Sequence, residues 1–180
     1  MGKNSTLRKI ALRCFICFKN CECLKVFQIS NIPQISINEY SFNMCQKLKR
    51  ISFEKVDDIT IESNAFSQCD LLETIDIKSK SRTYIDNNSF SNLKNLHTIS
   101  ITCEDIYIGE SCFQNYINLS AISFYDVKTI TLGKNAFLGC SKLQDFRINS
   151  IFKNNKQYIE FSTATIEQIY IGESCFQNCV

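Results

Sequence analysis

The residues of this chain best suited to chemistry are its eleven cysteines, which could act as nucleophiles, metal ligands or disulfide partners. Four of them, Cys14, Cys17, Cys21 and Cys23, lie close enough in sequence to suggest a zinc site. They do not form two C-x₂-C pairs, however, and no histidine lies nearby to complete a ligand set. The odd number of cysteines also argues against complete disulfide pairing. We therefore expect no bound metal and no cofactor.

The chain has one histidine, His97, so a cysteine nucleophile could be paired with an imidazole only there. His97 follows Leu96 at a position that should point away from the core, and the nearest candidate nucleophile, Cys103, lies beyond the next expected strand. The sequence contains no glycine-rich phosphate loop. We predict that the protein is not an enzyme and has no catalytic residues.

The element that must position these side chains is a repeat, marked by phenylalanines at intervals of 24 or 23 residues. A seventh copy, Phe176, follows the sixth after 39 residues, and its surroundings (169–178) duplicate residues 106–115 letter for letter. Fixed periods of this length are the signature of stacked repeat architectures. The first six phenylalanines are Phe18, Phe42, Phe66, Phe90, Phe113 and Phe137.

Each repeat has the same predicted elements. After each Phe, an L-x-x-I-x-I run alternates with period two, which predicts a short strand with two inward side chains. A second alternating pair precedes the next Phe and predicts another short strand. Between that pair and the Phe, residues such as Gly109 and Asn38 indicate a turn, and Asn64 or Ser111 is a candidate N-cap for one helical turn. Stacking the repeats would bury both pairs in continuous columns.

The cysteines follow the same repeat, which favours a structural role. Locked at one place in each repeat, they should behave as small buried hydrophobic residues. Disulfides between column neighbours are the alternative, because such neighbours could reach the required Cα separation. Five lie three residues after a Phe and three lie just before one: Cys21, Cys45, Cys69, Cys140 and Cys179, then Cys17, Cys112 and Cys175.

The repeat resembles that of a known family. The pattern I-x-I-G-x-x-A-F-x-x-C-x-x-L, best seen in residues 130–143 and 59–72, is similar to the BspA-like leucine-rich repeat and extends from Ala11 to Cys179. The resemblance implies a right-handed β-rich superhelix and, for many members, cell-surface adhesion or protein recognition. The chain departs from the family in having only one proline, Pro33, and no evident secretion signal.

These observations predict one repeat domain: a solenoid with short parallel strands and single helical turns. We expect an N-terminal tail over residues 1–10 and a solenoid of about 24 residues per repeat over 11–180. Extra residues near 149–165 predict an insertion, either a tolerated loop or a binding loop that projects from the solenoid. The last repeat stops before its L-x-x-I strand and is expected to be truncated.

Side chains that alternate with the inward pairs should face out and form the contact surface. On the first strand these form a mostly polar face. On the second strand, tyrosines are attractive because they are large, rigid and amphipathic, although exposed strand positions also simply favour Thr and Tyr. The predicted binding residues are Arg50, Ser52, Thr74, Asp76, Thr98, Ser100, Asp145 and Arg147 on the first strand, and Tyr84, Tyr107 and Tyr170 on the second.

The leading functional hypothesis is a non-enzymatic module that binds protein, with glycan as a second class of partner. The alternative is a structural piece of a larger repeat protein that self-associates through its uncapped C-terminal end. A formal net charge of +2 gives no broad basic field, so nucleic acid is not an expected partner.

Location is indicated by conflicting signals. The start MGKNST matches the N-myristoylation pattern with Gly2 as acceptor, so membrane attachment is expected only if Gly2 is acylated. Asn4, Asn87 and Asn118 lie in N-glycosylation sequons, which matter only outside the cell. With no signal peptide or membrane span evident, the sequence favours the cytoplasm or inner leaflet, whereas the family resemblance favours the cell surface.

Overall fold

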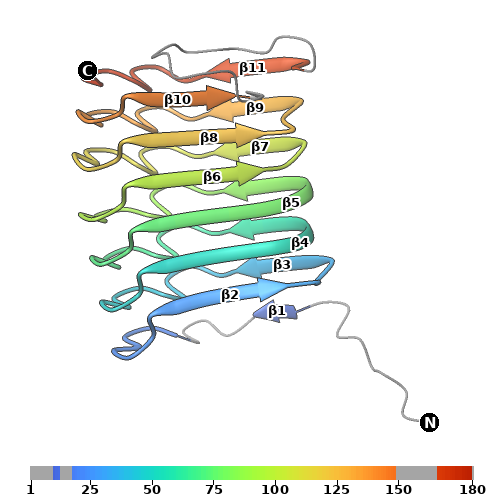
Figure 1. The fold of residues 1–180 in the computed structure, drawn as a ribbon, viewed down its shortest axis with the longest axis vertical. Coiled ribbons are helices and arrows are strands. Elements are labelled where there is room, and N and C mark those ends of the chain that lie inside the picture. The colour runs from blue at the N-terminus through green and yellow to red at the C-terminus, as the bar shows by residue number, and fades with distance from the viewer. Residues whose placement is uncertain (1–9, 13–17, 149–165, 180) are drawn as a thin grey trace.

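The computed structural model describes residues 10–12, 18–148 and 166–179. These residues form eleven parallel strands stacked along one axis (Figure 1). The strands are β1 (Ile10–Leu12), β2 (Val26–Ser30), β3 (Gln34–Ile37), β4 (Arg50–Ile61), β5 (Thr74–Ile85), β6 (Thr98–Thr102), β7 (Asp105–Ile108), β8 (Ala121–Tyr125), β9 (Thr129–Leu132), β10 (Asp145–Ile148) and β11 (Gln168–Ile171).

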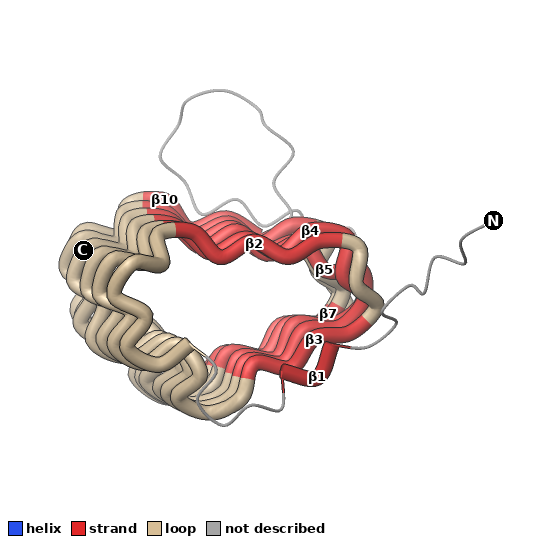
Figure 2. Tube along the Cα trace, turned by 90° about the horizontal axis from the view of Figure 1, so that it is seen from below, coloured by secondary structure: helices blue, strands red, loops and turns tan. Residues whose placement is uncertain are grey.

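The strands form two layers on opposite sides of a flattened tube, with turns along one narrow edge and a sharp bend along the other (Figure 2). The first layer runs β2, β4, β5, β6, β8, β10, and the second runs β1, β3, β4, β5, β7, β9, β11. Every pair is parallel and, outside the bend of β4 and β5, in register, so each residue lies beside its counterpart one repeat away. The predicted repeat solenoid is confirmed, and we call each repeat of it a rung.

The predicted inward pairs form the core. Ile51, Ile75, Ile99 and Ile122 form one column on the first layer, and each is at most 2% exposed. The repeat phenylalanines stack through the middle of the solenoid with ring centroids 4.7–5.5 Å apart and planes within 15° of parallel. Burying columns that a single rung would leave in water is what holds the rungs together.

The predicted helical turn is wrong, because no residue in the described part of the chain is helical. Around each repeat Phe, the described residues two before and two after it have left-handed backbones, such as Asn64 (φ 57°) and Gln68 (φ 62°) on either side of Phe66. A left-handed residue cannot continue a right-handed helix, and it lacks the extended backbone of an N-cap. The segment instead makes successive tight turns, such as Ser67 N–H to the Asn64 carbonyl at 3.1 Å.

The bend between the two layers also differs from the prediction of two separate short strands in two rungs. β4 and β5 run through it as continuous twelve-residue strands, whereas the other rungs have two separate strands. The register between β4 and β5 shifts on either side of Val56, next to Lys55 with its left-handed backbone (φ 54°). A bulge of this kind lets a strand turn sharply without ending.

The predicted insertion near 149–165 and residues 1–9 of the predicted tail lie outside the described residues. The strands on either side of the insertion keep the solenoid register. β10 pairs with β8, and Asp145 aligns with Ala121. β11 pairs with β9, and Gln168 aligns with Thr129.

Candidate binding faces

The cysteines hold the turns together. None of the nine cysteines in the described residues forms a disulfide. The thiol of Cys69 donates a hydrogen bond to the Phe42 carbonyl of the preceding rung at 3.1 Å, and Cys140 does the same to Phe113 at 3.1 Å. A cysteine in this column therefore gives the turn carbonyl a hydrogen-bond donor that an aliphatic side chain could not supply.

Burial makes most of these thiols poor nucleophiles. It raises the pKa of Cys112 and Cys140 to about 12, and that of Cys103 and Cys175 to about 11. Because the thiolate is the reactive form, these groups are inert near neutral pH.

The structure brings no metal or catalytic cluster together in the part of the chain it describes. No group of three or more His, Cys, Asp or Glu residues there could hold a metal ion, and the candidate zinc ligands Cys14 and Cys17 lie outside that part. His97 is exposed just before β6, and Cys103 is buried just after it, so the two lie at opposite ends of the strand.

The predicted first-strand residues share one surface, which we call the first-sheet face: the outward side chains of β2, β6, β8, β10 and the N-terminal halves of β4 and β5. In-register pairing places Arg50 beside Thr74 and Thr74 beside Thr98. Likewise Asp76 lies beside Ser100. The predicted residues of this strand therefore do form one continuous surface.

One predicted residue, Ser52, contributes almost nothing to this face. It points outward but is only 6% exposed, between its register partners Gln28 and Asp76. Alternation correctly gave its direction. It could not show that longer neighbours would cover a short side chain.

Two further residues belong to the face and were missed. Thr102 on β6 and Tyr125 on β8 are register partners, both partly exposed, one step further along the same alternation. Extending the period-two pattern by two residues would have found them. With them, the centre of the face carries no charge: Thr98, Ser100, Thr102, Ala121, Ser123 and Tyr125.

Charged residues border this centre on both sides and are engaged with one another. On the N-terminal side, the Lys78 ammonium lies 3.5 Å from Asp76 and 3.7 Å from Glu54. On the C-terminal side, Arg147 pairs with Asp145 along β10. Exposed pairs of this kind add little stability, but they fix where charge is displayed.

The predicted tyrosines lie on the other layer, on what we call the second-sheet face: the outward side chains of β3, β7, β9, β11 and the C-terminal halves of β4 and β5. Tyr84 and Tyr107 stack with centroids 4.6 Å apart and planes 5° from parallel. Register places Tyr107 beside Thr131 and Thr131 beside Tyr170. Tyr170 is 56% exposed.

The two sets of predicted residues therefore do not form one site. They lie on opposite sides of the tube in Figure 2. A small ligand can contact one face or the other, and only a partner that wraps around the solenoid could contact both.

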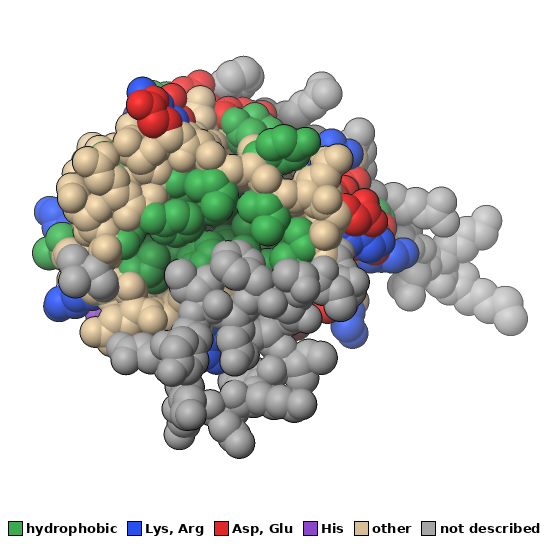
Figure 3. Space-filling view, turned by 90° about the horizontal axis from the view of Figure 1, so that it is seen from above, with side chains coloured by type: hydrophobic (Ala, Val, Ile, Leu, Met, Phe, Trp, Pro, Cys, Tyr) green, Lys and Arg blue, Asp and Glu red, His purple; other side chains and the backbone are tan. Residues whose placement is uncertain are grey.

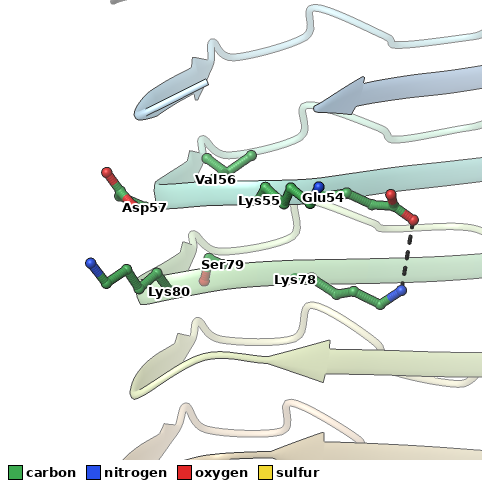
Figure 4. Close-up of a pocket in the computed structure, with 7 residues that line it drawn as sticks. All are labelled: Glu54, Lys55, Val56, Asp57, Lys78, Ser79 and Lys80. Carbon is green, nitrogen blue, oxygen red and sulfur yellow. Dashed lines mark ion pairs between the residues drawn. The ribbon is translucent and has the colours of Figure 1, made fainter. Parts of the chain in front are cut away.

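A pocket lies at the bend, and none of the predicted site residues lines it (Figure 4). It is lined by residues of both signs of charge from the bulged parts of β4 and β5, and in Figure 4 Lys80 and Asp57 point outward while Lys78 reaches toward Glu54. The lining residues are Glu54, Lys55, Val56, Asp57, Lys78, Ser79 and Lys80.

The structure describes some of the sequence motifs that bear on cellular location and not others. Gly2 and the sequon at Asn4 lie outside the described residues, so modification of either stays a prediction. Of the other two sequons, Asn118 donates from Nδ2 to the Lys94 carbonyl at 2.9 Å, and Asn87 accepts from Glu110 N–H at 2.7 Å. Where the chain is described, it has no helix long and apolar enough to cross a membrane.

Comparison with known proteins decides the family. Six copies of a repeat described as "BspA type Leucine rich repeat region" match residues 14–144, well over half of the chain. The chain belongs to the BspA-type leucine-rich repeat family. Leucine-rich repeats of this family generally form modules for protein interaction, and the recognised resemblance is confirmed.

The other comparisons add less to this assignment. No curated protein matches the chain. Among solved structures, it is similar to a leucine-rich repeat protein from Bacteroides ovatus at 16% identity, with a TM-score of 0.27, over 90% of this chain and 66% of that one. The chain thus spans just under two thirds of that protein. At such a TM-score the likeness carries no argument, and the family membership rests on the repeats.

Proposed function

We propose that this BspA-type repeat protein is a non-enzymatic module that binds a protein partner through its first-sheet face. The observation that carries the proposal is the uncharged centre on β6 and β8 between charged borders on β4, β5 and β10. Protein interfaces have this arrangement, because charges are depleted where water is excluded and tolerated at the rim.

The shape of the centre supports the same function. Its side chains are short, apart from Tyr125, and rise from strands held in strict register. A surface of this kind needs little rearrangement on binding, so little conformational entropy is lost. Tyr125 supplies the one large amphipathic side chain of the centre, a residue type enriched at interfaces.

Site-specific photocrosslinking tests this proposal. A photoreactive amino acid replaces Ser123 on the first-sheet face or, as the matched control, Thr60 on the second-sheet face; both positions are outward and partly exposed. In cells of the source organism, the Ser123 probe should capture a defined protein that the Thr60 probe does not. The purified protein should then bind the unmodified chain directly. Capture of the same protein from both positions, or failure of direct binding, would overturn the proposal.

Self-association through the C-terminal end is a second candidate function, favoured by the exposed apolar side chains of β11. Ile169 and Ile171 occupy inward columns, yet they are 41% and 55% exposed. Figure 3 views this end and shows hydrophobic side chains gathered at its centre. Light scattering over a hundredfold range of concentration tests this candidate. Replacement of Ile171 by Lys should abolish any self-association, and a wild-type chain that stays monomeric throughout would contradict it.

A further inference from the structure

We propose that Tyr107 and Tyr170 form the two walls of a glycan-binding site on the second-sheet face, in which one pyranose ring lies over Thr131. Tyr107 pairs in register with Thr131, and Thr131 pairs with Tyr170. The short Thr131 therefore leaves a gap one rung wide in a ladder of tyrosines. This site is separate from the proposed protein-binding face, which lies on the other side of the tube.

One wall is fixed in place by its neighbour. The Tyr84 and Tyr107 rings are 4.6 Å apart and 5° from parallel, so their separation matches the spacing of the rungs. The rings therefore stack along the solenoid axis. One face of Tyr107 is covered by Tyr84, and the other is turned toward Thr131 and the gap. An aromatic wall held in this way loses little freedom when a ligand binds.

The second wall is accessible. Tyr170 is 56% exposed, the most exposed of the tyrosines flanking the gap. Two residues beyond the tyrosine column lie glycines, Gly133 and its register neighbour Gly172, so no side chain projects outward beside the gap at that position. The Lys134–Glu173 ion pair, at 3.3 Å, lies next to these glycines and supplies charged groups that can hydrogen-bond to hydroxyls.

The width of the gap limits the ligand to a single ring between the walls. Two rungs separate the tyrosine walls, which is about 9.5 Å at roughly 4.7–4.9 Å per rung. The middle of the gap is then roughly 4.8 Å from each wall, close to the 4.6 Å between the stacked rings of Tyr84 and Tyr107. A puckered pyranose ring, with C–H groups projecting from both faces, can contact both walls at this spacing.

The chemistry of the gap agrees with this ligand. Aromatic faces carry negative charge density and attract the partly positive C–H groups of a sugar. The Thr131 hydroxyl at the floor and the phenol groups at the walls can donate to and accept from sugar hydroxyls. Apolar walls with a few polar groups are typical of small-molecule sites.

Filling the gap is the decisive test. Thr131→Tyr would complete the ladder and occupy the site, and it should fold normally because tyrosine already stands at this position in three rungs. Thr60→Tyr is the matched control, because it extends the ladder beyond Tyr84 without touching the gap. The probes are a printed array of defined oligosaccharides, followed by solution titration of cellohexaose, chitohexaose, mannohexaose and the strongest array member.

The expected result is that the wild-type chain and Thr60→Tyr bind the same glycan, whereas Thr131→Tyr and Tyr170→Ala each lose at least about tenfold in affinity (~1.4 kcal/mol). Tyr170→Ala should keep the fold, since the side chain is mostly exposed. Thermal melting checks both variants. Failure of the wild-type chain to bind any glycan on the array, or unchanged binding by the folded Thr131→Tyr variant, would overturn the proposal.

Discussion

The first residue of the turn that precedes each repeat Phe differs between the N-terminal and C-terminal halves of the solenoid. In the N-terminal half, the first turn residue is Asn38, Glu62 or Asp86, and side chains bridge the rungs there. Glu39 N–H donates to a Glu62 carboxylate oxygen at 3.0 Å, and the Ser63 hydroxyl donates to Asp86 at 2.9 Å. Within the described residues, the Tyr40 and Asn64 N–H groups make no backbone bond to the next rung.

In the C-terminal half the same position is glycine, and the backbone itself bridges the rungs. The N–H groups of Ser111 and Asn135 donate to carbonyls of the following rung, each at 3.0 Å, and so does Asn88 at the junction between the halves, where the following rung has Gly109. The rungs are then so close that a Cβ on Gly133 would lie 2.6 Å from the backbone carbon of Gly109.

The comparison shows that rungs of the same geometry can be joined at the turn either by side-chain hydrogen bonds or by backbone hydrogen bonds. A carboxylate or amide side chain can replace a backbone hydrogen bond, provided that a donor faces it. A glycine brings the backbones together, and in doing so it forbids any side chain at that position. Substitutions at the turns should therefore change the free energy of unfolding differently in the two halves, whereas substitutions in the core should change it equally.

The largest effect is expected where the halves do not differ. Phe66→Ala and Phe113→Ala each remove a fully buried ring from the continuous stack, one in each half. Each should lower the free energy of unfolding by about 3–5 kcal/mol. Urea denaturation measures both. A difference of several kcal/mol between the two variants would show that the halves differ in the core as well.

Gly133→Ala should reveal the difference between the halves. The added methyl group would collide with the backbone of Gly109 and Glu110, neither of which can rotate away. We expect a loss of about 1–3 kcal/mol, as for other overpacked sites. Asn38→Ala is the matched control in the other half, because a Cβ is already accommodated there and the substitution keeps the rung-bridging side-chain bonds of Glu62 and Asp86. Equal losses in the two variants by urea denaturation would contradict this difference between the halves.

The junction between the halves can be tested with pH, because Cys112 donates a hydrogen bond to the Asp86 carbonyl. Burial raises the pKa of Cys112 from 9.0 to about 12. Unfolded thiols ionise above pH 9 while the folded thiol stays protonated, so this residue's contribution is complete below pH 9 and falls as pH rises toward 12. The loss is up to about 1.4 kcal/mol per pH unit.

Cys112→Ala should therefore become more stable relative to wild type as pH increases. Alanine is tolerated in this column, since Ala65 and Ala136 occupy the same place in other rungs. Urea denaturation at pH 7, 9, 10 and 11 measures the difference. Parallel stability curves for the two proteins would mean that the Cys112 thiol ionises as easily in the folded state as in the unfolded one.

The smallest effect is expected for Glu62→Ala, which removes one exposed hydrogen bond from the N-terminal half. The loss should be about 0.5 kcal/mol, at the low end for a single bond. Hydrogen exchange is the sharper measurement. The Glu39 amide should exchange faster in the variant, while the amides of Asn88 and Ser111 keep their rates. Faster exchange at all three amides would show that the rungs open together.

Much of the interior was predictable because burial imposes a period. The Phe spacing fixed the rungs, and the paired isoleucines correctly predicted the inward positions of both layers. The turns were not predictable in the same way. Left-handed backbones at Tyr40, Met44 and Gln68 are imposed by the neighbouring rungs, and these residue types do not signal such a conformation. A helical turn was the natural but wrong interpretation of that segment.

For the candidate faces, the sequence predicted which side chains point outward but not how exposed each of them is. Alternation placed Ser100 and Tyr107 outward, and register then brought each beside its neighbours. It could not show that Ser52 is covered, nor that the two strands of a rung face opposite sides of the tube. Those outcomes depend on side-chain lengths in adjacent rungs and on the sharpness of the bend, which a single repeat does not encode.

The central claim is that the uncharged centre of the first-sheet face binds a protein, and charge placed on that centre tests it most directly. Ser100→Arg and Ser123→Arg put a cation at the centre, whereas Ser36→Arg and Thr60→Arg put one at outward positions of the second-sheet face. Affinity for the crosslinked partner, measured with purified proteins, should fall by at least about tenfold (~1.4 kcal/mol) in the first pair and stay unchanged in the second. Equal affinity in all four variants would contradict the account.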